Sequence, residues 1–110
     1  MLRIKVPTRG IDAPETTLSV QIKYGKKEDL QTKPFVFILP GGPGANHSHY
    51  RDYEYIQKVA NLIYYDPRGC GLSDKGEQTT YNMNNYIDDV HYIIKNELKL
   101  EQVILLGKSY

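Results

Sequence analysis

Three continuous apolar segments, separated by two segments of helical periodicity, constrain the fold of this chain more than any other feature. The apolar segments cover residues 35–39, 62–65 and 103–106. An unbroken apolar run of this length is typical of a strand that is buried on both faces of a sheet. Such strands are usually parallel, with helices on both sides of the sheet. This part of the sequence therefore predicts an α/β fold.

Apolar residues recur at helical spacing in both gaps between these segments. In the first gap, Tyr53, Ile56 and Val59/Ala60 form a short stripe, and Ser48 is the expected N-cap of that helix. The stripe in the second gap is longer and consists of Met83, Ile87, Val90, Ile94 and Leu98. We therefore expect one helix after the first buried strand and a second helix after the next one.

The ends of the second predicted helix have charges of opposite sign. Asp88 and Asp89 lie near its start, and Lys95 and Lys99 lie near its end. Acidic side chains at a helix N-terminus and basic ones at the C-terminus interact favourably with the helix dipole. We interpret both aspartates in this way.

Two segments near the amino terminus alternate apolar and polar residues. The apolar residues that would share a strand face are Leu2, Ile4 and Val6 in the first segment, and Leu18, Val20, Ile22 and Tyr24 in the second. This alternation is typical of antiparallel edge strands with one face in water. We therefore expect an antiparallel start, followed by parallel strands with helices on both faces.

Composition and charge exclude several classes of protein. The chain has 110 residues, the size of one small domain, and 40% of them are hydrophobic. The net charge of +1 gives no reason to expect binding to nucleic acid or to a membrane surface. No apolar run approaches the roughly 20 residues that cross a bilayer. With one cysteine, Cys70, and no secretory signal, we expect a cytoplasmic protein without cofactor or metal.

Three short segments that follow the buried strands have sequences suited to a functional site. Residues 40–44 read Pro-Gly-Gly-Pro-Gly, residues 66–74 read Asp-Pro-Arg-Gly-Cys-Gly-Leu-Ser-Asp, and residues 107–110 read Gly-Lys-Ser-Tyr. Ligands of open α/β sheets bind beyond the carboxyl ends of the parallel strands. We therefore expect these three segments to surround the site.

The segment Gly107-Lys108-Ser109 has two possible interpretations. A phosphate-binding loop needs a glycine five residues before Gly107, but that position is Gln102 and the residues between belong to the predicted strand. A nucleophile elbow, Gly-x-Ser-x-Gly after a strand, agrees better, although its second glycine would be residue 111. We therefore predict that Ser109 is a nucleophile.

The glycine-rich segment 40–44 has a matching role in this interpretation. Attack on a carbonyl group places negative charge on its oxygen, and backbone N–H groups aimed at that oxygen lower the barrier. One donor would be the N–H of Tyr110, directly after the nucleophile, and the other would come from a glycine in this segment. The alternative is a tight turn without a functional role.

Together these segments resemble the proline iminopeptidase family of α/β-hydrolases. Residues 40–44 are similar to the family's His-Gly-Gly-Pro-Gly loop, residues 66–73 to its Asp-Gln-Arg-Gly-Cys-Gly-x-Ser segment, and residues 107–110 to its Gly-Gly-Ser-(Trp/Tyr)-Gly-Gly elbow. The resemblance implies a serine peptidase that releases an N-terminal residue, often proline, from small peptide substrates. Pro40 and Pro67 replace the family's His and Gln, and hydrolases of other substrates vary at such positions.

The resemblance also implies roles for individual residues. Ser109 would be the nucleophile, and the N–H groups of Gly42 and Tyr110 would form the oxyanion hole. Residues that would shape the site loops without taking part in the chemistry are Gly41, Pro43, Gly44, Asp66, Arg68, Gly69 and Gly71. For Asp66 and Arg68 we expect an ion pair within the turn.

Catalysis by Ser109 would need partners that the printed sequence does not supply. A serine nucleophile needs a histidine base oriented by a carboxylate, and in this fold both follow the serine along the chain. His47, His49 and His91 all precede Ser109. We expect His91 on a helix surface and the other two in a solvated loop. Residues 1–110 are therefore expected to be the N-terminal part of one hydrolase domain, cut at the elbow and inactive alone.

Two other functions stay open, namely an α/β-hydrolase of ester or other acyl substrates and a truncated remnant that only binds or assembles. Serine rather than aspartate at position 109 argues against dehalogenases and epoxide hydrolases. The segment 103–106 would be an edge strand in a chain of this length, and an apolar edge strand pairs readily with another chain. We therefore expect self-association through residues 103–106.

Overall fold

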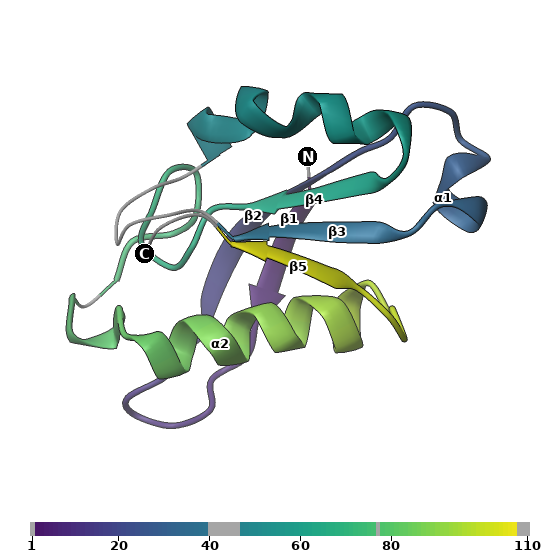
Figure 1. Ribbon diagram of the computed structural model, residues 1–110. Coiled ribbons are helices and arrows are strands. Elements are labelled where there is room, and N and C mark those ends of the chain that lie inside the picture. Colours follow the sequence, from purple (N-terminus) through teal and green to yellow (C-terminus); the bar gives the residue numbers. More distant parts are fainter. Residues whose placement is uncertain (1, 40–46, 77, 108–110) are drawn as a thin grey trace.

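A mixed sheet of five strands forms the centre of the structure (Figure 1). The computed structural model describes residues 2–39, 47–76 and 78–107. The strands are β1 (Leu2–Val6), β2 (Thr16–Lys23), β3 (Phe35–Leu39), β4 (Asn61–Tyr65) and β5 (Ile104–Gly107). Their order in the sheet is β1-β2-β4-β3-β5, with β3 parallel to both β4 and β5 and with antiparallel pairing of β2 to β1 and β4. The predicted α/β class with an antiparallel start is confirmed.

Helices cover both faces of this sheet, with η1 on one face and α2 followed by η3 on the other (Figure 1). The helical segments are α1 (Asp29–Thr32), the 3₁₀-helix η1 (His47–Lys58), the 3₁₀-turn η2 (Gln78–Thr80), α2 (Met83–Tyr92) and the π-helical turn η3 (Ile93–Glu97). The short segments α1 and η2 were not predicted. Because η1 begins at His47, Ser48 lies inside it and is not its N-cap. None of the described helices is long and apolar enough to span a membrane.

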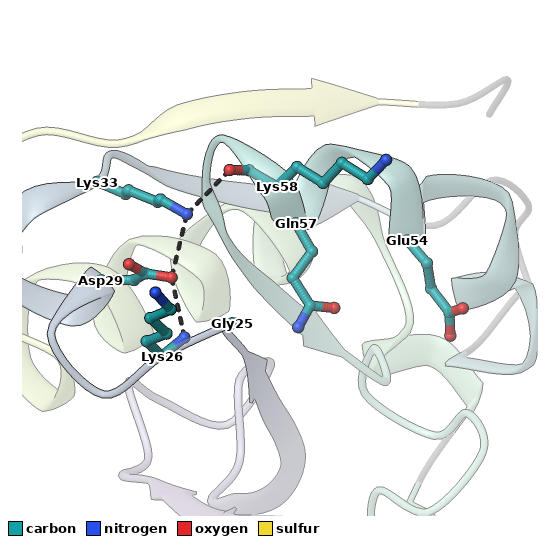
Figure 2. Close-up of a pocket in the computed structure, with 7 residues that line it drawn as sticks. All are labelled: Gly25, Lys26, Asp29, Lys33, Glu54, Gln57 and Lys58. Carbon is teal, nitrogen blue, oxygen red and sulfur yellow. Dashed lines mark hydrogen bonds and ion pairs between the residues drawn. The ribbon is translucent and has the colours of Figure 1, made fainter.

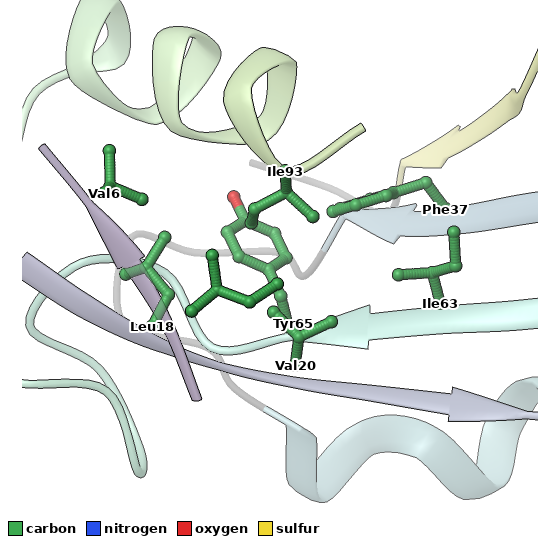
Figure 3. Close-up of a cluster of buried hydrophobic side chains, with 8 residues drawn as sticks. Val6, Leu18, Val20, Phe37, Ile63, Tyr65 and Ile93 are labelled. Atoms are coloured by element: carbon green, nitrogen blue, oxygen red, sulfur yellow. The ribbon is translucent and has the colours of Figure 1, made fainter. Parts of the chain in front are cut away.

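The larger hydrophobic cluster lies between the sheet and the helices α2 and η3 (Figure 3). Phe37 and Tyr65 are in contact within it, with ring centroids 5.2 Å apart and planes inclined by 58°. The buried members are Ile4, Val6, Leu18, Val20, Phe37, Ile63, Tyr65 and Ile93. Full burial of one such side chain contributes roughly 1.5–3 kcal/mol, so this cluster is a main source of stability.

A second cluster lies on the opposite face, under η1. Its buried residues are Val36, Ile38, Ala60, Leu62 and Tyr64, and Tyr53 and Ile56 of η1 pack against them. Successive residues of β3 and β4 therefore point alternately into the two clusters, as the pleat of a strand requires. This arrangement explains the continuous apolar runs, because both faces of these strands are buried.

The prediction that both alternating segments are edge strands with one wet face is wrong for β2. This strand lies between β1 and β4, and Ser19 on it is only 3% exposed. The N–H of Ser19 donates to Ser73 Oγ at 2.9 Å. The loop that contains Ser73 therefore packs against β2 at Ser19, so the polar residue at this position of the alternating pattern did not indicate solvent.

The predicted apolar stripe of α2 also needs correction. Met83 and Ile87 are 45% and 57% exposed, whereas Asp89 is fully buried and Tyr86 is 9% exposed. The helix therefore turns a different face to the sheet from the predicted one. Arg9 and Arg68, which are distant in the sequence, make this orientation possible because they pair with the buried Asp89. Asn82 is the N-cap of α2, and its side chain accepts the N–H of Asn85 at 2.9 Å.

The turn after η3 holds Lys99 in the left-handed region, with φ of 53°. The preceding turn is closed by the N–H of Leu98, which donates to the carbonyl oxygen of Ile93 at 2.9 Å. A residue with a Cβ atom pays a steric cost in this conformation, and glycine does not. The reversal that leads the chain from η3 to β5 is therefore made at some cost in stability.

Replacing Lys99 by glycine should stabilise the chain by about 0.5–1 kcal/mol, because the relieved strain exceeds the added freedom of the unfolded chain. The matched control is Lys95→Gly inside η3, which should destabilise it by about 1 kcal/mol. Urea unfolding of the two variants measures both effects. Equal losses of stability in both would contradict the left-handed assignment.

Candidate functional site at the carboxyl edge of the sheet

The parallel register brings the ends of three strands to one edge of the sheet. Leu39 at the end of β3 is paired with Gly107 at the end of β5, and Ile38 is paired with Tyr64 near the end of β4. The segments after residues 39, 65 and 107 therefore leave the sheet at neighbouring points. The predicted strand over residues 103–106 is confirmed, with β5 running from Ile104 to Gly107.

Six of the predicted site residues lie outside the part of the chain that the structure describes. They are the nucleophile Ser109, the oxyanion donors Gly42 and Tyr110, and the loop residues Gly41, Pro43 and Gly44. Their roles stay predictions. The side chains of His47 and His49 are not described either, whereas His91 is exposed on α2, as predicted.

The described part of the site is the loop of residues 66–76 after β4, called here the site loop. Asp66 at its start is fully buried, and its carboxylate accepts the N–H of Leu72 at 2.8 Å. The hydroxyl of Ser73 donates to the Asp66 carbonyl oxygen and accepts the N–H of Ser19. The loop is thereby closed on itself and attached to β2.

Two glycines in the site loop are required by backbone conformation and close contacts. Gly69 has φ of 79°, and a Cβ atom there would lie 2.1 Å from the Tyr81 ring. Gly71 has φ of 50°, and a Cβ atom there would lie 2.5 Å from the Asp66 carboxylate. Any side chain at either position would force the loop to move.

Two basic side chains hold the backbone of the site loop. Arg3 of β1 donates to Asp74 Oδ1 at 2.8 Å and also to the Leu72 carbonyl oxygen. Lys75 Nζ donates to the Gly69 carbonyl oxygen at 2.9 Å. With these contacts the loop forms a pre-organised wall at the carboxyl edge of the sheet.

Arg68 makes its ion pair with a different residue from the one predicted. Its guanidinium donates to both carboxylate oxygens of Asp89 on α2, at 3.0 Å and 2.8 Å, and not to Asp66 within the turn as we expected. Asp89 also accepts from Arg9 Nη2 at 3.0 Å. The interpretation of Asp88 and Asp89 as acidic residues near the helix start is wrong, because α2 begins at Met83 and has no acidic residue in its first turn. The Asp89 carboxylate is instead buried between two guanidinium groups. The helical position of Asp89 in the sequence did not reveal this pairing.

The comparison with known families agrees with this architecture. The family model for the alpha/beta hydrolase fold matches residues 34–110, which is more than half of the chain. The chain belongs to the alpha/beta hydrolase fold family. The matched region begins just before β3 and includes β4, the site loop and β5.

Relatives of this hydrolase-fold chain include proteins named proline iminopeptidase, so the resemblance seen in its motifs is confirmed. The protein from Clostridioides difficile is 32% identical over 88 residues, which cover 76% of this chain and 29% of the relative. The protein from Thermoplasma volcanium is 27% identical over 92 residues, which cover 83% of this chain and 30% of the relative. This chain therefore spans about a third or less of the length of these relatives.

A solved structure gives the same result for the fold. The crystal structure of a proline iminopeptidase from Mycobacterium smegmatis superimposes with a TM-score of 0.69 over 97% of this chain and 35% of that chain. The two sequences are 20% identical, so this likeness concerns the fold alone.

A cavity of about 620 Å³ lies at the other end of the hydrolase sheet and is not part of this site (Figure 2). Its lining residues precede β3 and β4, at the amino ends of the parallel strands. They are Gly25, Lys26, Asp29, Lys33, Glu54, Gln57 and Lys58. Lys33 Nζ bridges the Asp29 carboxylate and the Lys58 carbonyl oxygen at 3.1 Å and 2.9 Å. No group of three or more His, Cys, Asp or Glu suited to a metal ion occurs among the described residues.

The carboxylate in this cavity has a role in stability. The N–H of Lys26 donates to Asp29 Oδ2 at 2.9 Å. This backbone hydrogen bond, together with the hydrogen bond and charge of Lys33, lowers the pKa of Asp29 from its ordinary value of 3.8. The charged form is thus favoured in the folded state, so Asp29 contributes stability above its unfolded pKa.

Asp29→Asn should lower the free energy of unfolding near neutral pH, and the deficit should shrink as the pH falls below about 4. The sign follows from the lowered pKa, because the stabilisation disappears when the folded-state carboxylate becomes protonated. Urea unfolding of the parent and the variant over this range measures the difference. The neighbouring exposed acid gives a matched control, Glu28→Gln, which should show little effect. A deficit that is constant with pH would contradict the assignment.

Proposed function

We propose that this chain is the amino-terminal part of a serine hydrolase of the proline iminopeptidase type, which releases N-terminal residues, with proline favoured, from short peptides. The observation that supports it best is the end of β5. Gly107 lies beside the end of β3 in a parallel pair, and Ser109 follows two residues later. A nucleophile elbow needs this strand end at this edge of the sheet. The relatives named proline iminopeptidase support the substrate class.

In this proposal the Ser109 hydroxyl attacks the carbonyl carbon of the N-terminal residue. A histidine, oriented by a carboxylate, takes the hydroxyl proton, and in this fold both residues come after the nucleophile along the chain. The N–H groups of Gly42 and Tyr110 stabilise the oxyanion. The C–N bond then breaks, the histidine returns the proton to the leaving amine, and water hydrolyses the acyl-enzyme.

The site loop has a structural role in this mechanism. The Asp66 carboxylate is buried and accepts a backbone N–H, while Gly69 and Gly71 allow the close contacts of the turn. Arg68 is 2% exposed and paired with Asp89. These side chains therefore hold the wall of the site and do not meet the substrate as acid, base or nucleophile.

The exposure of β5 supports a larger domain in the active protein. In the strand register Leu105 shares a face with Phe37, and Ile104 shares the opposite face with Val36. Ile104 and Leu105 are nevertheless 55% and 56% exposed. A strand that is apolar on both faces is typical of the interior of a sheet, so further elements would cover β5 in the complete hydrolase.

A fluorophosphonate probe tests the nucleophile in a longer version of the protein that extends past residue 110. We expect labelling at Ser109 and none in the Ser109→Ala variant. The same protein should cleave prolyl amides, and the 110-residue chain should not, because Asp and His partners that follow Ser109 are required. Labelling at another residue would contradict the assignment of the nucleophile. Turnover of short-chain esters without prolyl amides would favour the ester hydrolase, and no labelling would favour a non-catalytic remnant.

The 110-residue chain should self-associate through β5, since this edge strand has no charged side chain between Val103 and Gly107. Leu105→Lys should shift the chain to a smaller species in sedimentation equilibrium. The matched control is Ile87→Lys on α2, because Ile87 is 57% exposed and Leu105 is 56% exposed. A chain that is monomeric at all concentrations, or an equal effect of both variants, would contradict this expectation.

A further inference from the structure

One buried carboxylate joins three segments that are far apart in the sequence. Asp89 of α2 accepts from Arg68 Nε at 3.0 Å and from Arg68 Nη2 at 2.8 Å, which is a bidentate pair. It also accepts from Arg9 Nη2 at 3.0 Å. Arg9 belongs to the segment between β1 and β2, and Arg68 belongs to the site loop. The three segments therefore meet at one point.

The burial of these charges makes their pairing indispensable. The side chains of Asp89 and Arg68 are 0% and 2% exposed, and that of Arg9 is 28% exposed. The neighbouring Asp88 is exposed, and its carboxylate comes no closer than 3.8 Å to Arg9 Nε. A buried guanidinium that loses its carboxylate is left without compensation in a medium of low polarity. Without Asp89, the conformation that buries Arg68 would therefore be strongly disfavoured.

Further hydrogen bonds tie the same segments together around this carboxylate. Arg68 Nη1 donates to the Pro14 carbonyl oxygen at 2.7 Å. The Asn85 side chain, one turn before Asp89 on α2, donates to the Asp12 carbonyl oxygen at 2.8 Å. The segment of residues 7–14 is thus fixed to the start of α2, and Arg68 lies between them.

We propose that Asp89 is a positioning residue of the hydrolase site. Through Arg68 it holds the site loop, residues 66–76, against α2 and the segment 7–14. Arg3 attaches this loop to β1 and Ser73 attaches it to β2, whereas the ion pair of Arg68 attaches it to α2. The inference rests on the proposed function in one respect, namely that this edge of the sheet is the active site.

A positioning residue and a residue that only stabilises the fold differ in which part of the protein opens more often after the residue is mutated. Loss of a residue that only stabilises the fold increases opening throughout the cooperative core. Loss of a positioning residue increases opening of the site loop beyond that of the core. The quantity that separates the two is the hydrogen-exchange rate of the site loop relative to that of β4.

Hydrogen exchange measured by mass spectrometry on the 110-residue chain gives this ratio from peptides that cover the site loop and β4. Asp89→Asn, which keeps the shape and removes the charge, should raise the ratio on the order of a hundredfold. The adjacent Asp88→Asn should leave it unchanged. Ile93→Val, a mutation of a fully buried residue one turn further along the same helical segment, should accelerate β4 without raising the ratio.

Arg9→Gln is a milder variant for the case that Asp89→Asn does not fold, because it leaves the bidentate pair in place. It should raise the ratio about tenfold, since one charge-assisted hydrogen bond is lost. An unchanged ratio in Arg9→Gln and in any folded Asp89→Asn would overturn the proposal, as would a rise of the same size in Asp88→Asn. The measurement needs no activity, so an error in the assignment of Ser109 would leave its outcome unaffected.

Discussion

The requirement that β3 and β4 be covered on both faces determines most of this structure. Phe37 and Ile63 point toward α2 and η3, while Val36, Ile38 and Leu62 point toward η1. A sheet that contains two such strands cannot leave one face exposed to water, so helices must pack on both faces. The connections then run from the carboxyl end of one strand, through a helix, to the next parallel strand. In this way the packing of the core also brings the carboxyl ends of β3, β4 and β5 together at one edge.

Much of this architecture could be predicted from local patterns in the sequence. Continuous apolar runs marked β3 and β4, because burial on both faces leaves a signal at every position of a strand, and a similar run marked β5 although Ile104 and Leu105 are more than half exposed. The alternating pattern also located β2 but misjudged its surroundings. Whether a polar position of a strand faces water or is covered by a loop depends on residues far away, here on the loop whose Ser73 accepts the backbone N–H of Ser19. A pattern with a period of two residues does not contain that information.

The candidate site shows the same division between local and distant information. The strand ends that precede the motifs at residues 40–44, 66–74 and 107–110 could be placed at one edge from strand order alone. The partner of Arg68 could not, because Asp89 lies on α2 and its carboxylate has the sequence context of an ordinary helix start. Its burial displaced the expected stripe, so that Met83 and Ile87 face outward. A wrong helix face and a wrong ion pair therefore had one cause, a pairing between residues separated by 21 positions.

The two margins of the sheet have opposite character. On β1, Arg3 and Lys5 are engaged in ion pairs with Asp74 and Glu15, and charges of this kind discourage the addition of another strand. Nothing comparable interrupts the short apolar run of β5. The sheet can therefore be extended in one direction only, by a strand that pairs with β5, while the charged margin at β1 closes the other side.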